Sequence, residues 1–393
     1  MNVGNMRMID RFAGVPLCWV TGVWHRILPS APLQPGDPSR PILVMKFFGM
    51  GSILLSTPLL NSLRRQFPAA PIVYVTFAAN RELLEKLPQP AVRLTLDTGS
   101  PVRFVFGAVR ALATIRRLKP RAVFDLEFFS KFSTLIAALS GAPVRIGFEL
   151  PARWRRWNLT HPVALDHASH VTQVFLRQLQ ALDSAPTADR IVTRVSATTP
   201  ERAQLATLFP YEDPNARSIV VNMNAGRTSL ERRWPPESFI EVVRTLAQGP
   251  DRWRFFFIGS QDEREYVKTA LAPNRDLSEV VVNCAGRLTI GELIALLEHA
   301  MLLLTNDSAP MHLAASVGTP VVALFGPESP ALYGPVGNAR VLYRGISCSP
   351  CLTVYNAKLF VCPYDARCMK EITVNEVISA VRETLATKQP GGA

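Results

Sequence analysis

Short apolar runs that alternate with helix-like segments recur along most of this chain. The runs at 41–46, 72–76 and 122–126 are apolar almost throughout, and each is followed by a segment with helical periodicity. A second series of the same kind occupies 218–325. Runs of this type are typical of strands that are buried on both faces of a parallel sheet. The alternation therefore predicts an α/β chain with two doubly wound, Rossmann-like parallel sheets.

The two series predict two domains. The chain has 393 residues, which is more than a single hydrophobic core usually serves. In doubly wound sheets, ligands bind beyond the carboxyl ends of the strands, so we expect two sheets that face one another across a ligand-binding cleft. The expected parts are an N-terminal amphipathic segment with a proline-rich linker at 1–40, a first domain at 41–200, a second domain at 201–370, and a C-terminal helix and tail at 371–393.

The charge balance indicates an anionic partner. Lys and Arg number 43 against 31 Asp and Glu, a formal net charge of +12. Nucleic acid, an acidic membrane face and phosphorylated substrates all fit this surplus. Because the basic residues are widely spread and no nucleic-acid-binding motif is visible, we expect no nucleic-acid partner. The first residues lack the order of a cleavable signal peptide, which predicts a cytoplasmic protein with reduced cysteines.

The segment at 11–28 is apolar but contains Gly, Thr, His and Arg, which make it a poor membrane-spanning helix. Trp19 and Trp24, with Arg26 nearby, suit a segment that lies in a membrane interface. A helix packed on the body of the protein is the alternative. The sequence favours neither.

The most distinctive motif is Thr305-Asn306-Asp307-Ser308-Ala309-Pro310-Met311-His312, at the end of an apolar run. Proline suits the first position of a helix, so this motif predicts a strand, a polar turn and a helix that begins near Pro310. The free N–H groups and the positive dipole end of such a helix suit a diphosphate. Asp307 or Ser308 can cap the helix, and capping alone is the alternative interpretation of both residues.

Three further loops follow predicted strand ends. In the segment 46–52, Gly49 and Gly51 allow a ligand to approach the backbone closely, although neither a dinucleotide fingerprint nor a P-loop is complete. The segment 224–235 is basic and can neutralise phosphate, or it is a solvated loop. The segment 259–263 offers carboxylates that either accept hydrogen bonds from ribose hydroxyls or begin a helix.

Together these motifs resemble glycosyltransferase family 9, the heptosyltransferases. The resemblance runs from about residue 41 to about residue 385. The block at 307–312 is its most specific part, with Ala309 where the family usually has Gly, and residues 145–148 resemble a mid-domain motif. The resemblance implies a GT-B fold whose N-terminal domain binds the acceptor and whose C-terminal domain binds the nucleotide-sugar. It also implies inversion at the anomeric carbon without a metal.

The resemblance assigns roles to individual positions. It places a basic residue that neutralises phosphate, an acidic residue near the ribose and a lysine near the sugar in the matching loops. It places four residues of the distinctive block beside the donor diphosphate and sugar. In this sequence Arg232 is the basic residue, Glu263 the acidic residue and Lys46 the lysine. The four residues beside the donor diphosphate and sugar are Asp307, Ser308, Met311 and His312.

Ser52 departs from the family pattern. Well-characterised members carry an Asp after the Met-Gly pair, where it serves as general base on the acceptor hydroxyl. A serine hydroxyl does not accept a proton usefully at neutral pH without a base of its own. Glu127 and Asp125 follow the apolar run at 122–126, at the correct end for the cleft. We expect Glu127 to be the base, with Asp125 second. Asp125 holding neighbouring loops together is the alternative.

Four of the six cysteines cluster near the C-terminus, at Cys348, Cys351, Cys362 and Cys368. Their number suits a structural zinc or iron–sulfur site, although the spacing is not that of a standard zinc finger. We expect structural or partly paired thiols, with a metal site as the alternative.

We therefore expect an inverting, metal-independent glycosyltransferase that needs no cofactor. It would move a heptose-like sugar from ADP-heptose or a similar donor to a lipopolysaccharide core or a related surface glycan. Two alternatives are a transferase for another sugar in capsule or exopolysaccharide assembly, and a non-catalytic sugar-nucleotide-binding or scaffold protein. Basic residues are dense between 103 and 156. They suit a phosphorylated glycolipid or peripheral contact with the cytoplasmic membrane face, or they form a soluble basic surface.

Overall fold

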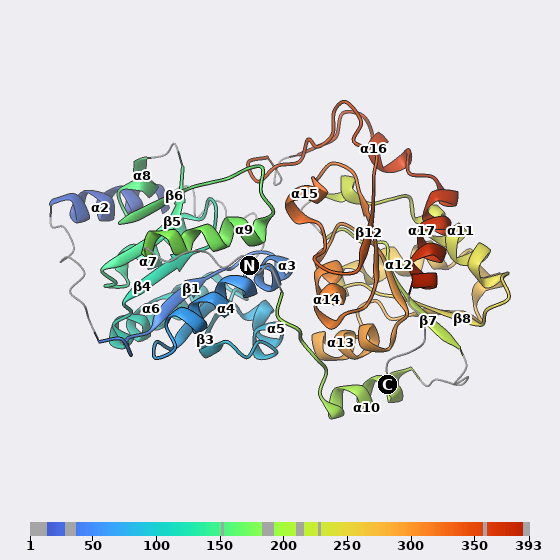
Figure 1. The fold of residues 1–393 in the computed structure, drawn as a ribbon, viewed down its shortest axis with the longest axis horizontal. Helices are drawn as coiled ribbons and strands as arrows, with labels where there is room; N and C mark the ends of the chain where they lie inside the picture. The colour runs from blue at the N-terminus through green and yellow to red at the C-terminus, as the bar shows by residue number, and fades with distance from the viewer. Residues whose placement is uncertain are drawn as a thin grey trace. The chain divides into compact units, whose positions relative to one another are not determined.

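The computed structural model describes residues 14–27, 37–150, 153–182, 192–209, 216–226, 229–356 and 360–387. The chain divides into two compact units, Met1–Thr193 (unit 1) and Arg194–Ala393 (unit 2), each with its own sheet (Figure 1). Most of the expected linker at 1–40 and Arg227 of the basic loop lie outside the described residues.

Unit 1 is built on a six-stranded parallel sheet in the order β3-β2-β1-β4-β5-β6. The central strands are apolar and buried along their whole length, which explains why their sequences show no alternation. The strands are β1 (Ile42–Met45), β2 (Ile72–Phe77), β3 (Pro90–Leu96), β4 (Ala122–Asp125), β5 (Val144–Glu149) and β6 (His161–Ala164).

Helices cover both faces of this sheet. They are α2 (Gly14–Ile27), α3 (Met50–Leu55), α4 (Thr57–Gln66), α5 (Arg81–Glu85), α6 (Pro101–Leu118), α7 (Lys131–Leu139), α8 (Arg153–Arg156) and α9 (Val171–Leu176), with 3-10 turns at Ala78–Asn80 and Arg177–Leu182. The sequence predicts a single helix over 53–66, with Pro58 near its first turns, and this prediction is wrong because α3 and α4 are separate. Pro58 has no N–H for the helical ladder, and the Thr57 hydroxyl donates to Leu54 O instead, at 2.6 Å.

Unit 2 repeats the plan with a second six-stranded parallel sheet, in the order β12-β11-β10-β7-β8-β9. Its strands are β7 (Arg217–Asn222), β8 (Trp253–Phe257), β9 (Val281–Asn283), β10 (Leu302–Asn306), β11 (Val321–Phe325) and β12 (Ala339–Tyr343). Its helices are α10 (Thr199–Leu208), α11 (Pro236–Ala247), α12 (Arg264–Leu271), α13 (Ile290–His299), α14 (Ala309–Val317), α15 (Pro330–Tyr333), α16 (Arg367–Lys370) and α17 (Val374–Thr387), with 3-10 turns at Leu230–Arg232, Gln261–Glu263 and Arg275–Leu277.

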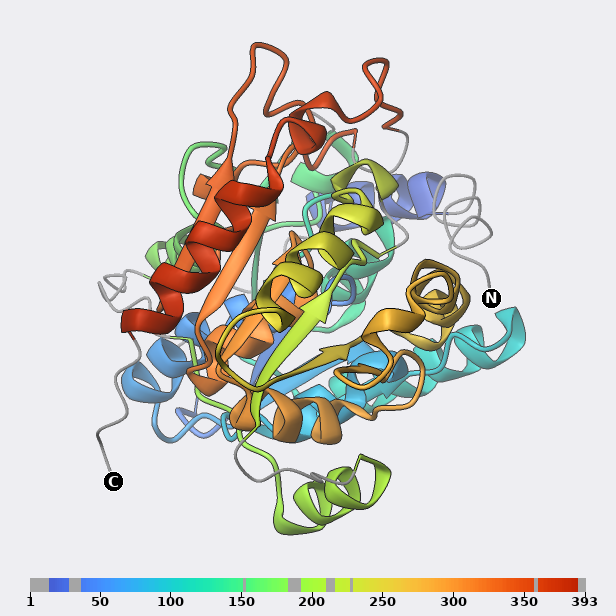
Figure 2. The same ribbon diagram turned by 90° about the vertical axis from the view of Figure 1, so that its right-hand side faces the viewer.

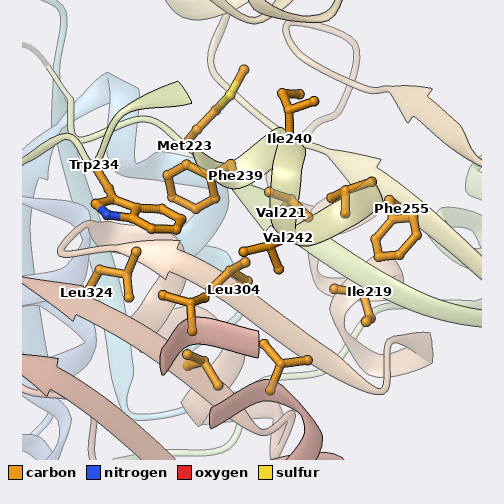
Figure 3. Packing of buried hydrophobic residues seen from close by; sticks show 14 of the residues in the cluster. Ile219, Val221, Met223, Trp234, Phe239, Ile240, Val242, Phe255, Leu304 and Leu324 are labelled. Atoms are coloured by element: carbon orange, nitrogen blue, oxygen red, sulfur yellow. The ribbon is translucent and has the colours of Figure 1, made fainter. Parts of the chain in front are cut away.

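The core of unit 2 lies between its strands and the helices α11 and α17, which lie side by side on one face of the sheet (Figure 2). Trp234, at the end of the loop before α11, is fully buried among these side chains and packs edge-on against Phe239 with ring centroids 5.0 Å apart (Figure 3). Its indole N–H donates to Ile372 O at 2.9 Å, so the burial leaves no polar atom of the ring unsatisfied.

Both sheets have the same topology. Reading the first sheet from β3 and the second from β9, each follows the doubly wound order 3-2-1-4-5-6. The order reverses between β1 and β4 in unit 1 and between β7 and β10 in unit 2, and we call these two places the switch points. The pair of doubly wound parallel sheets predicted from the sequence is thereby confirmed.

Candidate active site

The switch point of unit 1 brings together Lys46, which follows β1, and Glu127, which follows β4. Met45 and Asp125 are paired in the register of these strands, so the residues that follow them lie close together. Lys46 Nζ donates to Glu127 Oε1 at 3.0 Å, and both residues are buried, with 4% and 5% of their surface exposed. Strand pairing thus joins two charges that are 81 positions apart.

Glu127 also holds the backbone of the glycine loop. The N–H groups of Phe47 and Phe48 donate to the same Oε1 atom, at 2.6 and 3.0 Å. Three donors on one oxygen fix the orientation of this carboxyl group. The side chain is therefore held at the carboxyl end of the sheet, as the sequence predicted for a site residue.

Asp125 is enclosed by a different set of partners. Its carboxylate accepts from Arg155 Nη2 at 3.1 Å, from Ser133 Oγ at 2.9 Å and from the Glu127 N–H at 3.1 Å. Burial raises the pKa of Asp125 to about 6, and the Arg155 guanidinium opposes that rise. Arg155 in turn donates to Glu127 O and Phe148 O. With no exposed surface, Asp125 joins α7, α8 and the ends of two strands.

Ser52 and the two glycines form the turn into α3. Gly49 has φ +82°, which only glycine adopts without strain, and a Cβ there would lie 3.1 Å from Ser52 Oγ. Gly51 is buried in the first turn of α3, while Ser52 is half-buried.

In unit 2, the switch point places the end of β7 beside the end of β10. Asn222 Nδ2 donates to Thr305 Oγ1 at 2.9 Å and to Ser308 Oγ at 2.7 Å. Ser308 occupies the N-cap position of α14, yet its side chain makes no hydrogen bond to the helix. The expectation that Asp307 or Ser308 caps α14 through its side chain is therefore wrong, because Asn222 engages the Ser308 hydroxyl and Arg232 engages Asp307. The amino end of α14 therefore has no side-chain cap among the described residues, although Pro310 has no N–H and Met311 N donates to Ser308 O at 3.1 Å.

Arg232 forms the second ion pair at a switch point. Its Nη1 donates to Asp307 Oδ2 and to Asp307 O, both at 3.2 Å, and its Nη2 donates to Ala225 O at 2.5 Å. The buried Nε of Arg232 has no hydrogen-bond partner among the described residues. Burial raises the pKa of Asp307, and the nearby Arg232 opposes that rise.

Glu328 joins this group, although the sequence analysis did not single it out. It follows β11 and is 8% exposed. Burial first, and the charge of Asp307 second, raise the pKa of Glu328 to about 8, while Arg232 opposes the rise. The signal was its position beyond a strand that neighbours β10, but its proximity to Asp307 depends on sheet order, which the sequence does not show.

The remaining residues that were predicted to contact the nucleotide-sugar lie on the elements around this switch point. Met311 and His312 are both buried in α14, 0% and 6% exposed. Glu263 accepts from Ser260 N and Ser260 Oγ, each at 2.8 Å, in a capping box at the start of the turn before α12. Of the two interpretations of this carboxylate, the structure displays the one in which it begins a helix.

The four C-terminal cysteines lie near one another and form no disulfide. Burial and then the neighbouring Cys351 raise the pKa of Cys368 to about 11. Within the part of the chain that the structure describes, no group of three or more His, Cys, Asp or Glu side chains is arranged to hold a metal ion.

Known proteins share this sequence pattern and this fold. A family model described as glycosyltransferase family 9 (heptosyltransferase) matches residues 116–359. Lipooligosaccharide heptosyltransferase 2 of Haemophilus influenzae is 26% identical over 311 residues, covering 77% of this chain and 88% of that protein.

Two solved structures extend the comparison to the fold. A glycosyltransferase family 9 structure from Veillonella parvula has a TM-score of 0.72 at 24% identity, covering 89% of this chain and 98% of that one. The E. coli ADP-heptose lipopolysaccharide heptosyltransferase II has a TM-score of 0.71 at 20% identity, covering 88% and 99%. The expected GT-B class of fold is thereby confirmed.

Proposed function

The chain belongs to glycosyltransferase family 9, the heptosyltransferases, and on that premise we propose which reaction it catalyses. It transfers a heptose from ADP-heptose to a lipopolysaccharide core or a related glycolipid, with inversion at the anomeric carbon and without a metal. Unit 1 binds the acceptor and unit 2 binds the nucleotide-sugar. The donor and acceptor classes are those in the names of the relatives, which are heptosyltransferases of lipopolysaccharide or lipooligosaccharide.

The observation that carries the proposal is the group of unused donors at the switch point of unit 2. The Nε of Arg232 is buried and has no partner among the described residues, and α14 begins without a side-chain cap. A buried guanidinium donor and the amino end of a helix are complementary to a diphosphate. As the bond between the sugar and the diphosphate breaks, the same groups stabilise the negative charge that develops on the leaving group.

Glu127 is the proposed general base. The three donors that reach its side chain among the described residues all bind Oε1, so Oε2 is the atom proposed to accept the proton of the acceptor hydroxyl. The hydroxyl oxygen then attacks the anomeric carbon from the face opposite the diphosphate, and the nucleoside diphosphate departs. Lys46 keeps the carboxylate oriented. Asp125 is not the base in this scheme, and its donors and its complete burial support a framework role in unit 1.

Ser52 supports one rival, a protein that binds sugar-nucleotides without transfer, because the family's usual base is an Asp at this position. A transferase for another sugar in capsule or exopolysaccharide assembly is the other rival. A panel of ADP-, GDP- and UDP-sugars in a thermal-shift assay separates the donors, and transfer of labelled heptose to lipopolysaccharide that lacks it tests catalysis. We expect stabilisation by ADP-heptose and transfer. Stabilisation without transfer supports the binding protein, and no stabilisation by any nucleotide contradicts the proposal.

The acceptor is a glycolipid, so the proposal also includes a cytoplasmic location with peripheral contact to the cytoplasmic membrane face. No described helix is long and apolar enough to cross a membrane.

A further inference from the structure

Helix α2 exposes a continuous apolar stripe. Leu17, Val20, Trp24 and Ile27 are 51%, 66%, 62% and 71% exposed. Their spacing of three, four and three residues places all four on one side of a helix. A helix at the surface of a water-soluble domain normally carries polar residues on its outer side, so this stripe is unusual for a surface that faces only water.

The opposite side of α2 is anchored, so the stripe is held facing outward. Cys18 and Gly22 are buried, and a Cβ at Gly22 would lie 3.0 Å from Trp157 Cβ. Asn158 Nδ2 donates to Cys18 O at 2.8 Å, and His25 Nε2 lies 3.0 Å from Ala138 O. The sequence posed a packed helix and an interfacial helix as alternatives. The inner side of α2 is packed on the protein, as the first alternative predicts. The outer side has the exposed apolar residues that the second alternative, an interfacial helix, requires.

Helix α6 carries a second stripe of the same kind. Val102, Val105, Phe106 and Val109 are 75%, 58%, 76% and 64% exposed, with the spacing of one helix face. The other face of α6 is buried in the core, where Phe104 packs against Phe132 of α7 with ring centroids 4.9 Å apart. Both α2 and α6 therefore contact α7, and Figure 1 shows these three helices in the same part of unit 1.

Basic residues accompany the two stripes. Neither helix contains an Asp or a Glu, and each carries arginine, all of it exposed: Arg26, Arg103, Arg110, Arg116 and Arg117. Nearby acidic residues are already paired, Asp97 with Arg103 and Glu149 with Arg156.

Aromatic rings add a third property of this surface. Trp19 and Trp157 pack edge-on at 4.9 Å, and the Arg26 guanidinium lies 5.2 Å from the centre of the Trp157 ring. Apolar side chains with tryptophan and arginine at their margin are the combination that binds at the surface of an anionic bilayer.

We propose that the exposed faces of α2 and α6, here called the docking face, bind the surface of an anionic lipid bilayer. The arginines favour an anionic surface over a zwitterionic one, and they disfavour a second copy of this chain, which would present the same positive charge. Its placement at the cytoplasmic face rests on the proposed function. Lipid binding itself does not require transfer, so the two can be tested separately.

The test is vesicle flotation with the full-length purified chain. We expect binding to vesicles of phosphatidylethanolamine and phosphatidylglycerol, and at least tenfold weaker binding to phosphatidylcholine vesicles. The double variants V20S/W24S and V105S/F106S change only exposed side chains, and each should weaken binding to the anionic vesicles at least tenfold. The control variant L230S removes an apolar side chain of unit 2 that is 55% exposed, and it should bind as the wild type does.

The proposal would be overturned if the wild type and both double variants bound anionic vesicles equally well. It would also be overturned if the wild type did not bind anionic vesicles. Self-association that the double variants abolish, without lipid binding, would assign the docking face to a second copy instead. Thermal stabilisation by ADP-heptose and transfer to a delipidated acceptor report the proposed function independently. Retained transfer with lost flotation supports the docking face, whereas retained flotation without transfer contradicts only the proposed function.

Discussion

The two switch points occupy the same place in two sheets of the same topology, and each holds an ion pair, which is buried in unit 1 and partly exposed on its arginine in unit 2. Lys46 and Glu127 join the ends of β1 and β4, and Arg232 and Asp307 join the loop after β7 to the end of β10. In both units the basic residue follows the strand that comes first along the chain, β1 or β7. The carboxylate follows the strand that comes fourth, β4 or β10. Shared topology therefore explains why each pair forms, but not what each pair can do.

The pairs differ in how their hydrogen-bonding capacity is used. In unit 1, three donors bind one oxygen of the Glu127 carboxylate and thereby fix its orientation. In unit 2, a guanidinium retains a buried Nε without a partner among the described residues, beside two carboxyl groups whose pKa values are raised. In the proposed function, the first arrangement orients a proton acceptor and the second offers a donor to an anion. One topology thus supports opposite chemical tasks through the loops at its strand ends.

The largest expected effect is on transfer in Glu127→Gln. Loss of a positioned general base lowers the rate by about 10²–10⁴-fold. Because the change lies in unit 1, we expect kcat to fall while the thermal shift with ADP-heptose stays as in the wild type. Glu149→Gln, at a half-exposed ion pair of the same unit, is the control. Normal turnover by Glu127→Gln would remove the assignment of this residue as base.

Asp125→Asn separates a framework carboxylate from a catalytic one. The change leaves the fully buried Arg155 guanidinium without its counter-charge, and breaking such a pair costs about 3–5 kcal/mol of unfolding free energy. A urea titration followed by circular dichroism measures the loss. Asp97→Asn breaks an ion pair that is more than half exposed, and we expect no more than about 1 kcal/mol from it. Equal midpoints for the two variants would show that Asp125 has no framework role.

Arg232→Gln tests the anion site of unit 2. Removal of one charge-stabilising donor typically costs about 10²–10³-fold in kcat. We expect the affinity for ADP to fall as well, whereas Glu127→Gln leaves it intact. Arg340→Gln, at a half-exposed pair with Glu383, is the matched control. Since Arg232→Gln also leaves Asp307 buried and unpaired, the double variant R232Q/D307N is measured alongside. If both variants bind ADP normally, the diphosphate lies elsewhere.

Glu328 predicts a smaller, pH-dependent effect. Its pKa of about 8 means that the carboxyl group is mostly neutral at pH 7 and ionises between pH 7 and 9. The new negative charge repels a diphosphate, so ADP affinity should fall as the pH rises, by roughly tenfold at most. Glu328→Gln should flatten this dependence in calorimetric titrations from pH 6.5 to 9. The same slope in both proteins would assign it to another group.

The sign of the accompanying stability effect follows from the same shift. A carboxyl group whose folded-state pKa lies above its unfolded value binds more protons when folded. Its contribution to stability is complete below about pH 4.5 and is lost as the pH rises through 8. Unit 2 of the wild type should therefore lose stability over this range relative to Glu328→Gln.

Local sequence signals determined the class of fold and the position of the site loops. Strands that are apolar throughout indicated parallel sheets, and polar or glycine-containing turns at their ends marked Lys46, Arg232 and Asp307. The pattern of apolar residues within a segment indicates which of its faces are buried, and this pattern can be recognised from neighbouring residues along the chain. The same kind of signal failed at Pro58, where apolar spacing suggested one helix and a missing N–H produced two.

Only the tertiary structure decided which of these residues meet. Strand order pairs β1 with β4 and β7 with β10, and this pairing brings Lys46 to Glu127 across 81 positions and Arg232 to Asp307 across 75. Glu328 joined the second group, and the Ser308 hydroxyl turned to Asn222 instead of capping α14, for the same reason. Contacts between strand ends depend on the long-range arrangement of whole strands, which no local pattern of residues encodes.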